Sequence, residues 1–462
     1  MNQHSLLTGT PEQIALAAEL YELVADLPII SPHGHVDPRM LAENKPFANP
    51  AELFIYFDHY VTRLLHAEGY DLSELGRGEL SEESHRNAWR IMCRNWHIFA
   101  GTNSGYWLTR TFENLFGIDE TPSATNADDI YDAIAAKLAT AEFLPRSLFS
   151  KFKIEFLATT DDPCDDLSFH EQLNSDESFS GRVTPTFRPD AYLDPRLPNW
   201  KSNVERLVSL CNLGELNYKN FIQALEERRA YFVARGAVSA DHGVYEPYTT
   251  ELTLDRASEL FVAALDGNIS AGDAREFAGH MLTEMARMSI NDGLVMTIHA
   301  GVLRNHNRET FERFGADTGH DIPVTAEFTN NLQVLLNRYG NHKNLTVILF
   351  CLDESVWARD IAPLAGFYPS VRIGAPWWFL DAADSAMRFR EKTTEIAGFY
   401  RGSGFIDDTR AFLSIPARHE MARRVDSLYL ARLVSAGRIA VEQARSIAVD
   451  LVDAIPRKAF KL

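Results

Sequence analysis

Leu27-Pro28-Ile29-Ile30-Ser31-Pro32-His33-Gly34-His35-Val36-Asp37 is the stretch around which the rest of this sequence is organised. A short apolar run ends at Pro32, which predicts a strand that stops just before two histidines. Residues two apart in an extended segment point to the same side, so His33 and His35 project together. Two imidazoles at the carboxyl end of a strand can bind a divalent transition metal. The alternative is a pair of surface histidines in a turn, and their place after an apolar strand favours the metal site.

Composition and charge limit the partners that this protein can have. The chain has 462 residues, 45% of them hydrophobic, which is enough apolar sequence for a large core. Its 64 acidic side chains outnumber the 45 basic ones and give a formal net charge of −19. Nucleic acids and anionic membranes select basic surfaces, so we expect neither as a partner. An anionic substrate would need positive charge gathered locally in its pocket.

Cysteine spacing and hydropathy predict a cytoplasmic protein. The four cysteines are far apart and form no CxxC pair, which is typical of reduced thiols. The first residues lack the basic and apolar regions of a secretory signal, and no apolar run approaches ~18 residues. Because large acidic chains often self-associate, we also expect a homo-oligomer, although the sequence indicates no interface.

Seven further apolar runs predict an alternation of strands and helices. They cover residues 154–160, 182–187, 237–240, 294–298, 345–350, 371–374 and 404–406. With the first strand they make eight, each followed by polar or aromatic residues. This order predicts one α/β domain over residues 1–462, a (β/α)8 TIM-type barrel with its site at the carboxyl face. An open doubly wound sheet is the alternative, but no GxGxxG follows any strand.

Helices account for the rest of the chain. Thr10 and Gln13 have the spacing of a capping box, which predicts a first helix beginning at Pro11. Residues from about 40 to 150 contain no convincing strand and predict a mostly helical insertion after the first strand. Residues from about 420 to 462 are also helical and are expected to pack against the barrel.

Metal-ligating residues follow the first, fifth and last predicted strands: His33 with His35, His299, and Asp408. Two or three imidazoles with one carboxylate, leaving one coordination position open, form a common catalytic site. Alone, His299 would be interpreted as a hydrogen-bonded core histidine, and Asp407 with Asp408 as a solvated turn. Their joint placement at strand ends favours a metal site.

Two arginines bring positive charge to the same predicted loops. Arg188 follows the third strand and Arg410 follows the last, and a guanidinium fork suits a carboxylate or a phosphate. Structural arginines that bridge neighbouring aspartates are an equally good interpretation. In the insertion, His59 and Tyr60 could act as general acid and base. A structural role on the aromatic face of a helix is the simpler interpretation.

Seven motifs taken together resemble those of the glucuronate (uronate) isomerase family, a branch of the amidohydrolase superfamily. From about residue 27 to the C-terminus they are His33-Gly34-His35, Asp58-His59-Tyr60, Phe187-Arg188-Pro189-Asp190, Asp241-His242-Gly243, His299 followed by Arg304-Asn305, Trp377-Trp378-Phe379, and Asp408-Thr409-Arg410 with Phe412-Leu413-Ser414. The resemblance implies an aldose–ketose isomerase of uronate catabolism, converting D-glucuronate to D-fructuronate and D-galacturonate to D-tagaturonate. The chain departs from the family at Thr409, where serine is more common.

The resemblance also implies roles for individual residues. The implied ligands of a single divalent metal, usually zinc, are His33, His35 and Asp408, with His299 at or near it and no organic cofactor. The implied substrate-binding residues are Arg188, Arg410, His59 and Trp377, with the C6 carboxylate on at least one arginine. The implied catalytic residues are Tyr60, as the proton carrier, His59, Asp408 and Arg410. The neighbouring Asp407 leaves the carboxylate ligand open.

Two other functions fit parts of the sequence. A mononuclear metal-dependent hydrolase or decarboxylase of an acidic substrate would use the same barrel. No lysine follows a mid-barrel strand to bridge two metals, which disfavours a binuclear hydrolase. A metal-stabilised binding protein is disfavoured by the number of chemically active residues at strand ends. For an isomerase, proton transfer through an enediol and a direct hydride shift both remain open.

Overall fold

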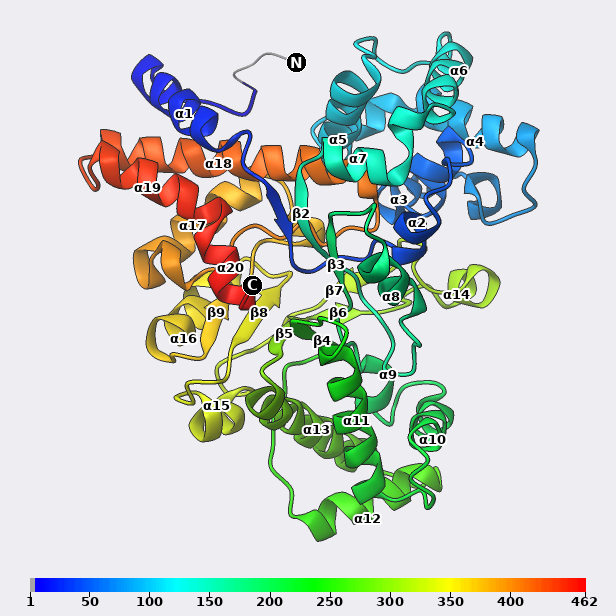
Figure 1. Ribbon diagram of the computed structural model, residues 1–462, viewed down its shortest axis with the longest axis vertical. Coiled ribbons are helices and arrows are strands. Elements are labelled where there is room, and N and C mark those ends of the chain that lie inside the picture. Colours follow the sequence, from blue (N-terminus) through cyan, green and yellow to red (C-terminus); the bar gives the residue numbers. More distant parts are fainter. Residues whose placement is uncertain (1–4) are drawn as a thin grey trace.

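Parallel strands alternating with helices form the centre of the molecule (Figure 1). The computed structural model describes residues 5–462. One sheet contains β1 (Ile29–Ser31), β2 (Ile154–Ala158) and β3 (Arg182–Thr184). The other contains β4 (Ser239–Val244), β5 (Val295–Ala300), β8 (Val347–Cys351) and β9 (Val371–Ile373). All neighbours within these two sheets are parallel.

Single backbone bridges join the two sheets. Phe187, three residues beyond β3, forms parallel bridges with Asp161 beyond β2 and with Ala240 in β4. The amide of Asp241 donates to the carbonyl of Phe187 at 2.9 Å. The strand that starts as β3 therefore continues past its ladder and links β2 to β4.

The ring closes between the last segment and the first. Ile373 at the end of β9 bridges Gly402, and the amide of His35 donates to the carbonyl of Thr409 at 3.0 Å. Eight parallel segments thus follow one another around a closed (β/α)8 barrel, which confirms the predicted fold. The predicted eighth strand over 404–406 forms no ladder, because Gly404 and Asp408 have left-handed backbones that a strand cannot hold.

The insertion between β1 and β2 is helical. Its α-helices are α2 (Pro38–Glu43), α3 (His59–Ala67), α4 (Glu82–Arg94), α5 (Asn103–Thr111), α6 (Ala127–Leu138) and α7 (Pro145–Lys151). They share a core that includes buried Trp89, Phe54 and Phe112 together with Leu157 of β2. Packing against β2 fixes the insertion over the carboxyl side of the barrel.

The remaining helices surround the barrel, some of them packed on other helices (Figure 1). Those between β2 and β9 are α8 (Ser168–Ser175), α9 (Asp190–Leu193), α10 (Trp200–Leu210), α11 (Tyr218–Val233), α12 (Leu254–Leu265), α13 (Ala271–Asp292), α14 (Arg308–Phe314), α15 (Gln333–Tyr339) and α16 (Ala362–Phe367). Among these, α10 packs on α11 and α12 packs on α13. α17 (Ala383–Ala397) follows β9, and the chain ends in α18 (Ile415–Ser435), α19 (Val441–Val452) and α20 (Ala454–Phe460). α18 packs against α1 (Pro11–Val24), which begins at the predicted Thr10–Gln13 capping box. Within residues 5–462 no helix combines the length and apolarity needed to cross a bilayer.

A small antiparallel hairpin was not predicted. β6 (Val302–Leu303) pairs with β7 (Ile322–Pro323) directly beyond β5. Each strand has only two residues, too few for an alternating pattern to be visible in the sequence. The hairpin forms the base of a loop, residues 304–321, that carries α14.

Candidate active site

The turn after β1 delivers two imidazoles to the carboxyl end of the barrel. Asp37 caps α2 by accepting a hydrogen bond from the amide of Arg39, so the helix begins at Pro38, three residues after His35. Thr160, beyond β2, donates its hydroxyl to the carbonyl of Gly34 at 2.7 Å and holds this turn. His33 is buried, whereas His35 remains partly exposed.

Asp408 is the point on which three histidines converge. Its Oδ1 lies 3.0 Å from His35 Nε2 and 3.5 Å from His33 Nε2, and its Oδ2 lies 3.8 Å from His299 Nε2. The rings of His33 and His299 are stacked with centroids 4.7 Å apart. Asp408 has a φ of 39°, and non-glycine residues held in this region cluster at functional sites. The aspartate that converges with the histidines is therefore Asp408 rather than Asp407, which accepts a hydrogen bond from His419.

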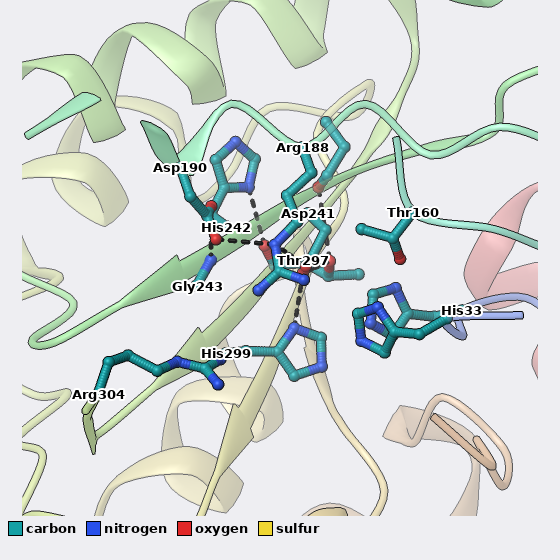
Figure 2. Close-up of polar contacts among 12 residues, drawn as sticks. His33, Thr160, Arg188, Asp190, Asp241, His242, Gly243, Thr297, His299 and Arg304 are labelled. Carbon is teal, nitrogen blue, oxygen red and sulfur yellow. Dashed lines mark hydrogen bonds and ion pairs between the residues drawn. The ribbon is translucent and has the colours of Figure 1, made fainter. Parts of the chain in front are cut away.

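An aspartate from β4 fixes the ring of His299 (Figure 2). His299 Nδ1 lies 2.6 Å from Asp241 Oδ1, and the hydroxyl of Thr297 donates to the same oxygen at 2.7 Å. In the tautomer in which Nδ1 donates to Asp241, His299 presents the Nε2 lone pair toward the carboxylate of Asp408. That buried Nε2 has no hydrogen-bond partner among the described residues. Two acceptors face each other here, an arrangement that a cation between them would satisfy.

The protonation states also suit a cation. Burial lowers the pKa of His33 to about 4, so this imidazole is neutral at neutral pH. Burial opposes ionisation of Asp408, but His33, His35 and His299 outweigh that effect and hold the pKa of Asp408 well below its usual range. A neutral imidazole and an ionised carboxylate are ligands that divalent transition metals bind, and His33, His35 and Asp408 lie close enough together to share one ion.

A cavity of about 640 Å³ opens above this cluster. Seven of the nine site residues expected from the sequence line it: His35, His59, Tyr60, Arg188, Trp377, Asp408 and Arg410. The other two, His33 and His299, are buried beside Asp408. The structure thus brings together residues from the first strand, the insertion and the last segment of the barrel.

The two arginines differ in how far their charge is already compensated. Arg188 Nε lies 2.8 Å from Asp190 Oδ2 and 3.5 Å from Asp241 Oδ2 (Figure 2). Arg410 has one looser contact, 3.6 Å from its Nη2 to Asp317 Oδ1. Arg410 is therefore the more available of the two for an anionic ligand.

The start of α3 places His59 and Tyr60 in the cavity wall. Asp58 caps the helix by accepting from the amide of Tyr60 at 2.9 Å, so the next two side chains project from its first turn. Burial raises the pKa of Tyr60 above its usual value, although Arg418 lies 5.3 Å from its ring and opposes the effect. Burial, and then Arg410, lower the pKa of His59 to about 3. Both side chains are neutral at neutral pH.

Trp377 packs edge-on against His299, with ring centroids 4.7 Å apart. Its buried indole Nε1 has no hydrogen-bond partner among residues 5–462. A donor without a partner on a cavity wall is free to bind an oxygen of a ligand.

Asp241, Asp161 and Asp317 are among the cavity and cluster residues that were not expected as site residues from the sequence. Asp241 follows the fourth strand and obeys the same strand-end pattern, which could have identified it. Asp161 lies beyond β2 and lines the cavity, and the same pattern applies to it. Asp317 lies in the loop after β6, where no sequence pattern marks it.

Comparisons with known proteins agree with this geometry. A family model for glucuronate isomerase matches residues 11–456. The uronate isomerase of Cutibacterium acnes is 48% identical, covering 100% of this chain and 98% of that protein, and that of Corynebacterium efficiens is 47% identical, covering 99% and 98%. The crystal structure of glucuronate isomerase from Caulobacter crescentus superposes with a TM-score of 0.97 at 43% identity, covering 100% of this chain and 97% of that one. Uronate isomerase from Thermotoga maritima gives a TM-score of 0.93 at 27% identity, covering 100% and 99%.

Proposed function

The chain belongs to the glucuronate isomerase family, and from this premise we propose that it interconverts aldo- and keto-hexuronates with the help of one divalent metal. The proposed reactions are D-glucuronate to D-fructuronate and D-galacturonate to D-tagaturonate. The observation that carries the proposal is one cavity that combines the histidine–aspartate cluster with the loosely paired Arg410. A hexuronate needs both, because its carbonyl end is reactive and its other end is a carboxylate.

The proposed metal is zinc, held by His33, His35 and Asp408 with His299 beside it. The unpartnered Nε2 of His299, facing Asp408, supports a cation at this place. When bound, such a metal acts as a Lewis acid toward substrate oxygens. The chain's own contribution is Asp241, which holds His299 in the tautomer that a ligand must have.

Arg410 is proposed to bind the C6 carboxylate. Its guanidinium has no carboxylate within hydrogen-bond distance among the described residues, whereas Arg188 is already bound to Asp190. Charge-assisted pairing of a guanidinium with a carboxylate is strong and directional, so it would orient the sugar along the cavity. Arg188 and Trp377, which line the same wall, are proposed to contact sugar hydroxyls.

The proposed isomerisation moves protons and leaves the overall oxidation state of the sugar unchanged. After ring opening, the C2 proton is removed and O1 gains a proton, which gives an enediol. Loss of the O2 proton and protonation of C1 then give the 2-ketose. The ionised carboxylate of Asp408 is proposed to take the proton that starts ring opening.

Tyr60 is proposed to act as the acid in this sequence. Because burial raises the pKa of its phenol, the group is protonated at neutral pH and can donate toward an oxygen that develops negative charge. Neutral His59, stacked on Tyr60 at 4.9 Å, is proposed to hydrogen-bond the same end of the sugar.

Metal analysis combined with a ketose-formation assay on D-glucuronate and D-galacturonate tests the proposal. We expect one divalent metal per chain and a product of the same mass as the substrate. A product heavier by one water would identify a hydrolase, and loss of carbon dioxide a decarboxylase. Turnover in deuterium oxide separates the two isomerase routes, since an enediol incorporates deuterium at C1 of the ketose and a hydride shift does not.

A further inference from the structure

A covering loop, residues 304–321 between β6 and β7, extends over the cavity and carries α14. Its base is the short antiparallel hairpin in which Leu303 pairs with Ile322. Both ends of the loop reach the cavity, since Arg304 and Asn305 line it from one end and Asp317 and Asp321 from the other. The covering loop is thus part of the site and not only a surface connection.

A hydrogen bond, an ion pair and a close approach of the backbone hold the covering loop against the helical insertion. The carbonyl of Asp317 accepts a hydrogen bond from Arg77 Nη2 at 3.2 Å, and Arg313 pairs with Asp71 at 3.2 Å. The covering loop and the insertion approach so closely at Gly319 that a Cβ added there would lie 2.7 Å from the Cβ of Arg63. These contacts hold the backbone at Asp317 without using its carboxylate.

The carboxylate of Asp317 is directed at Arg410. The two side chains are 48% and 30% exposed, and Oδ1 of Asp317 lies 3.6 Å from Nη2 of Arg410, too far for a hydrogen bond. Burial disfavours the charge on Asp317, but Arg410 and Arg304 outweigh it and lower its pKa. A loosely held carboxylate therefore already stands beside the proposed anchor of the substrate.

The other cavity arginines are held more tightly. Arg304 Nη1 donates to Asp321 Oδ2 at 2.8 Å, and the amide of Asn305 donates to the other oxygen of Asp321 at 2.7 Å. Arg188 donates to Asp190 at the same 2.8 Å distance. The contact between Asp317 and Arg410 is the one that a ligand can exchange most easily.

We propose that Asp317 limits the affinity of the site for anionic ligands, as an internal counter-ion of Arg410 that the carboxylate of an incoming ligand must displace. The inference rests on the proposed function, in which Arg410 binds the carboxylate of a hexuronate. Two carboxylates on one guanidinium repel each other, so every anionic ligand binds more weakly than it would to an unoccupied Arg410. A hexuronate offsets this loss through its hydroxyls, whereas a small organic acid such as acetate cannot. Asp317 thereby weakens the binding of simple carboxylates and the retention of the ketose product.

Asp317→Asn removes the negative charge of this side chain while keeping its size. Asparagine tolerates the left-handed backbone at this position, where φ is 58°, and it keeps the carbonyl that Arg77 binds. Glu309→Gln is the matched control, because it removes a carboxylate from α14 of the same loop at an exposed position away from the cavity.

Calorimetric binding of D-galacturonate and inhibition by acetate are the readouts, alongside kcat and KM. In Asp317→Asn we expect the Kd for galacturonate and the Ki for acetate both to fall about two- to fivefold, the range of a partly exposed ion pair. The difference should shrink when the salt concentration is raised, since screening weakens the pair. Glu309→Gln should match the wild type in both constants.

Two results would overturn the inference. A weaker binding of galacturonate in Asp317→Asn would mean that the carboxylate contacts the sugar instead of competing with it. Unchanged constants for both ligands would mean that Asp317 does not compete for Arg410. Failure of the proposed function is a separate result, because it would appear as wild-type protein that binds galacturonate but forms no ketose.

Discussion

Asp161 gives a quantitative prediction, because it is a buried carboxyl on the cavity wall without a cation partner. Both of its hydrogen bonds, from the hydroxyl of Thr159 at 2.7 Å and the amide of Thr186 at 3.2 Å, go to Oδ2. The nearest ionisable ring, His170, has Nε2 3.9 Å from Oδ1, but burial lowers the pKa of His170 to about 4 and keeps it neutral. Burial consequently raises the pKa of Asp161 from 3.8 to about 7.

The sign of the effect on stability follows from where the proton is lost. Below about pH 4 the carboxyl is protonated in both the folded and the unfolded chain. As the pH rises toward 7, the unfolded chain loses this proton while the folded chain retains it, so the free energy of unfolding falls. The difference between 3.8 and about 7 corresponds to roughly 4 kcal/mol, of which about 2 kcal/mol is lost between about pH 5 and pH 7.

Asp161→Asn should remove this dependence. Its amide oxygen can accept both hydrogen bonds now made to Oδ2, and the side chain never ionises. With an unfolding entropy of about 2 cal/mol/K per residue, a chain of this length shifts its Tm by about 1 °C per kcal/mol. The Tm of the variant relative to wild type should therefore rise by about 2 °C between about pH 5 and pH 7.

Differential scanning calorimetry at equal metal content, across that pH range, is the assay. Asp119→Asn is the control, because the same substitution at an exposed position should leave the two Tm curves parallel. Parallel curves for Asp161→Asn would refute the reasoning, since they would mean that Asp161 ionises as an ordinary surface aspartate does.

Three other perturbations have defined outcomes. Tyr60→Phe keeps the stacking on His59 but loses the phenolic proton, so kcat should fall at least ~100-fold with little change in KM. A kcat near that of the wild type in steady-state assays would remove Tyr60 from the mechanism. Dialysis against a chelator should abolish ketose formation and lower the Tm, and adding zinc should restore both. Activity in protein that contains no metal by elemental analysis would contradict the proposed site. Arg418→Met leaves the carboxylate of Asp381 buried without its cation, so the free energy of unfolding measured in urea should fall by about 3–5 kcal/mol. A negligible fall would mean that the pair is not needed for stability.

Local patterns in the sequence were sufficient to predict the barrel and to place His33, His35 and the Asp407–Asp408 pair at the same end of it, but not to choose between the two aspartates. Both follow from short-range rules, since an apolar run predicts a strand and parallel strands bring their carboxyl ends together. The pairing of Arg188 with Asp190 also lies within one motif. Asp317 could not have been predicted, because its contact with Arg410 depends on where an irregular loop packs on the insertion.

The sequence also does not predict whether an ionisable side chain is buried or paired with a cation. Asp161 and Asp162 are neighbours with the same side chain, yet Asp161 is buried without a cation whereas Asp162 pairs with Arg206 at 2.6 Å. Which of two adjacent aspartates is desolvated depends on the register of β2 against β3 and on residues far along the chain. Sequence patterns therefore identify candidate side chains better than they identify protonation states.

A buried ion pair connects the parts of the site that come from distant segments. Arg418 of α18 donates to Asp381 at 2.5 Å and to the carbonyl of Asp407, next to Asp408. Its guanidinium also lies 3.3 Å from the ring centroid of Trp107 in α5 and faces Tyr60. Burying two charges costs free energy that an apolar pair would not, so stability alone does not account for the arrangement. The pair instead fixes positions. Arg418 contacts both the segment that carries Asp408 and the insertion that carries Tyr60, so the proposed acid and the proposed metal ligand keep a fixed relation across the cavity.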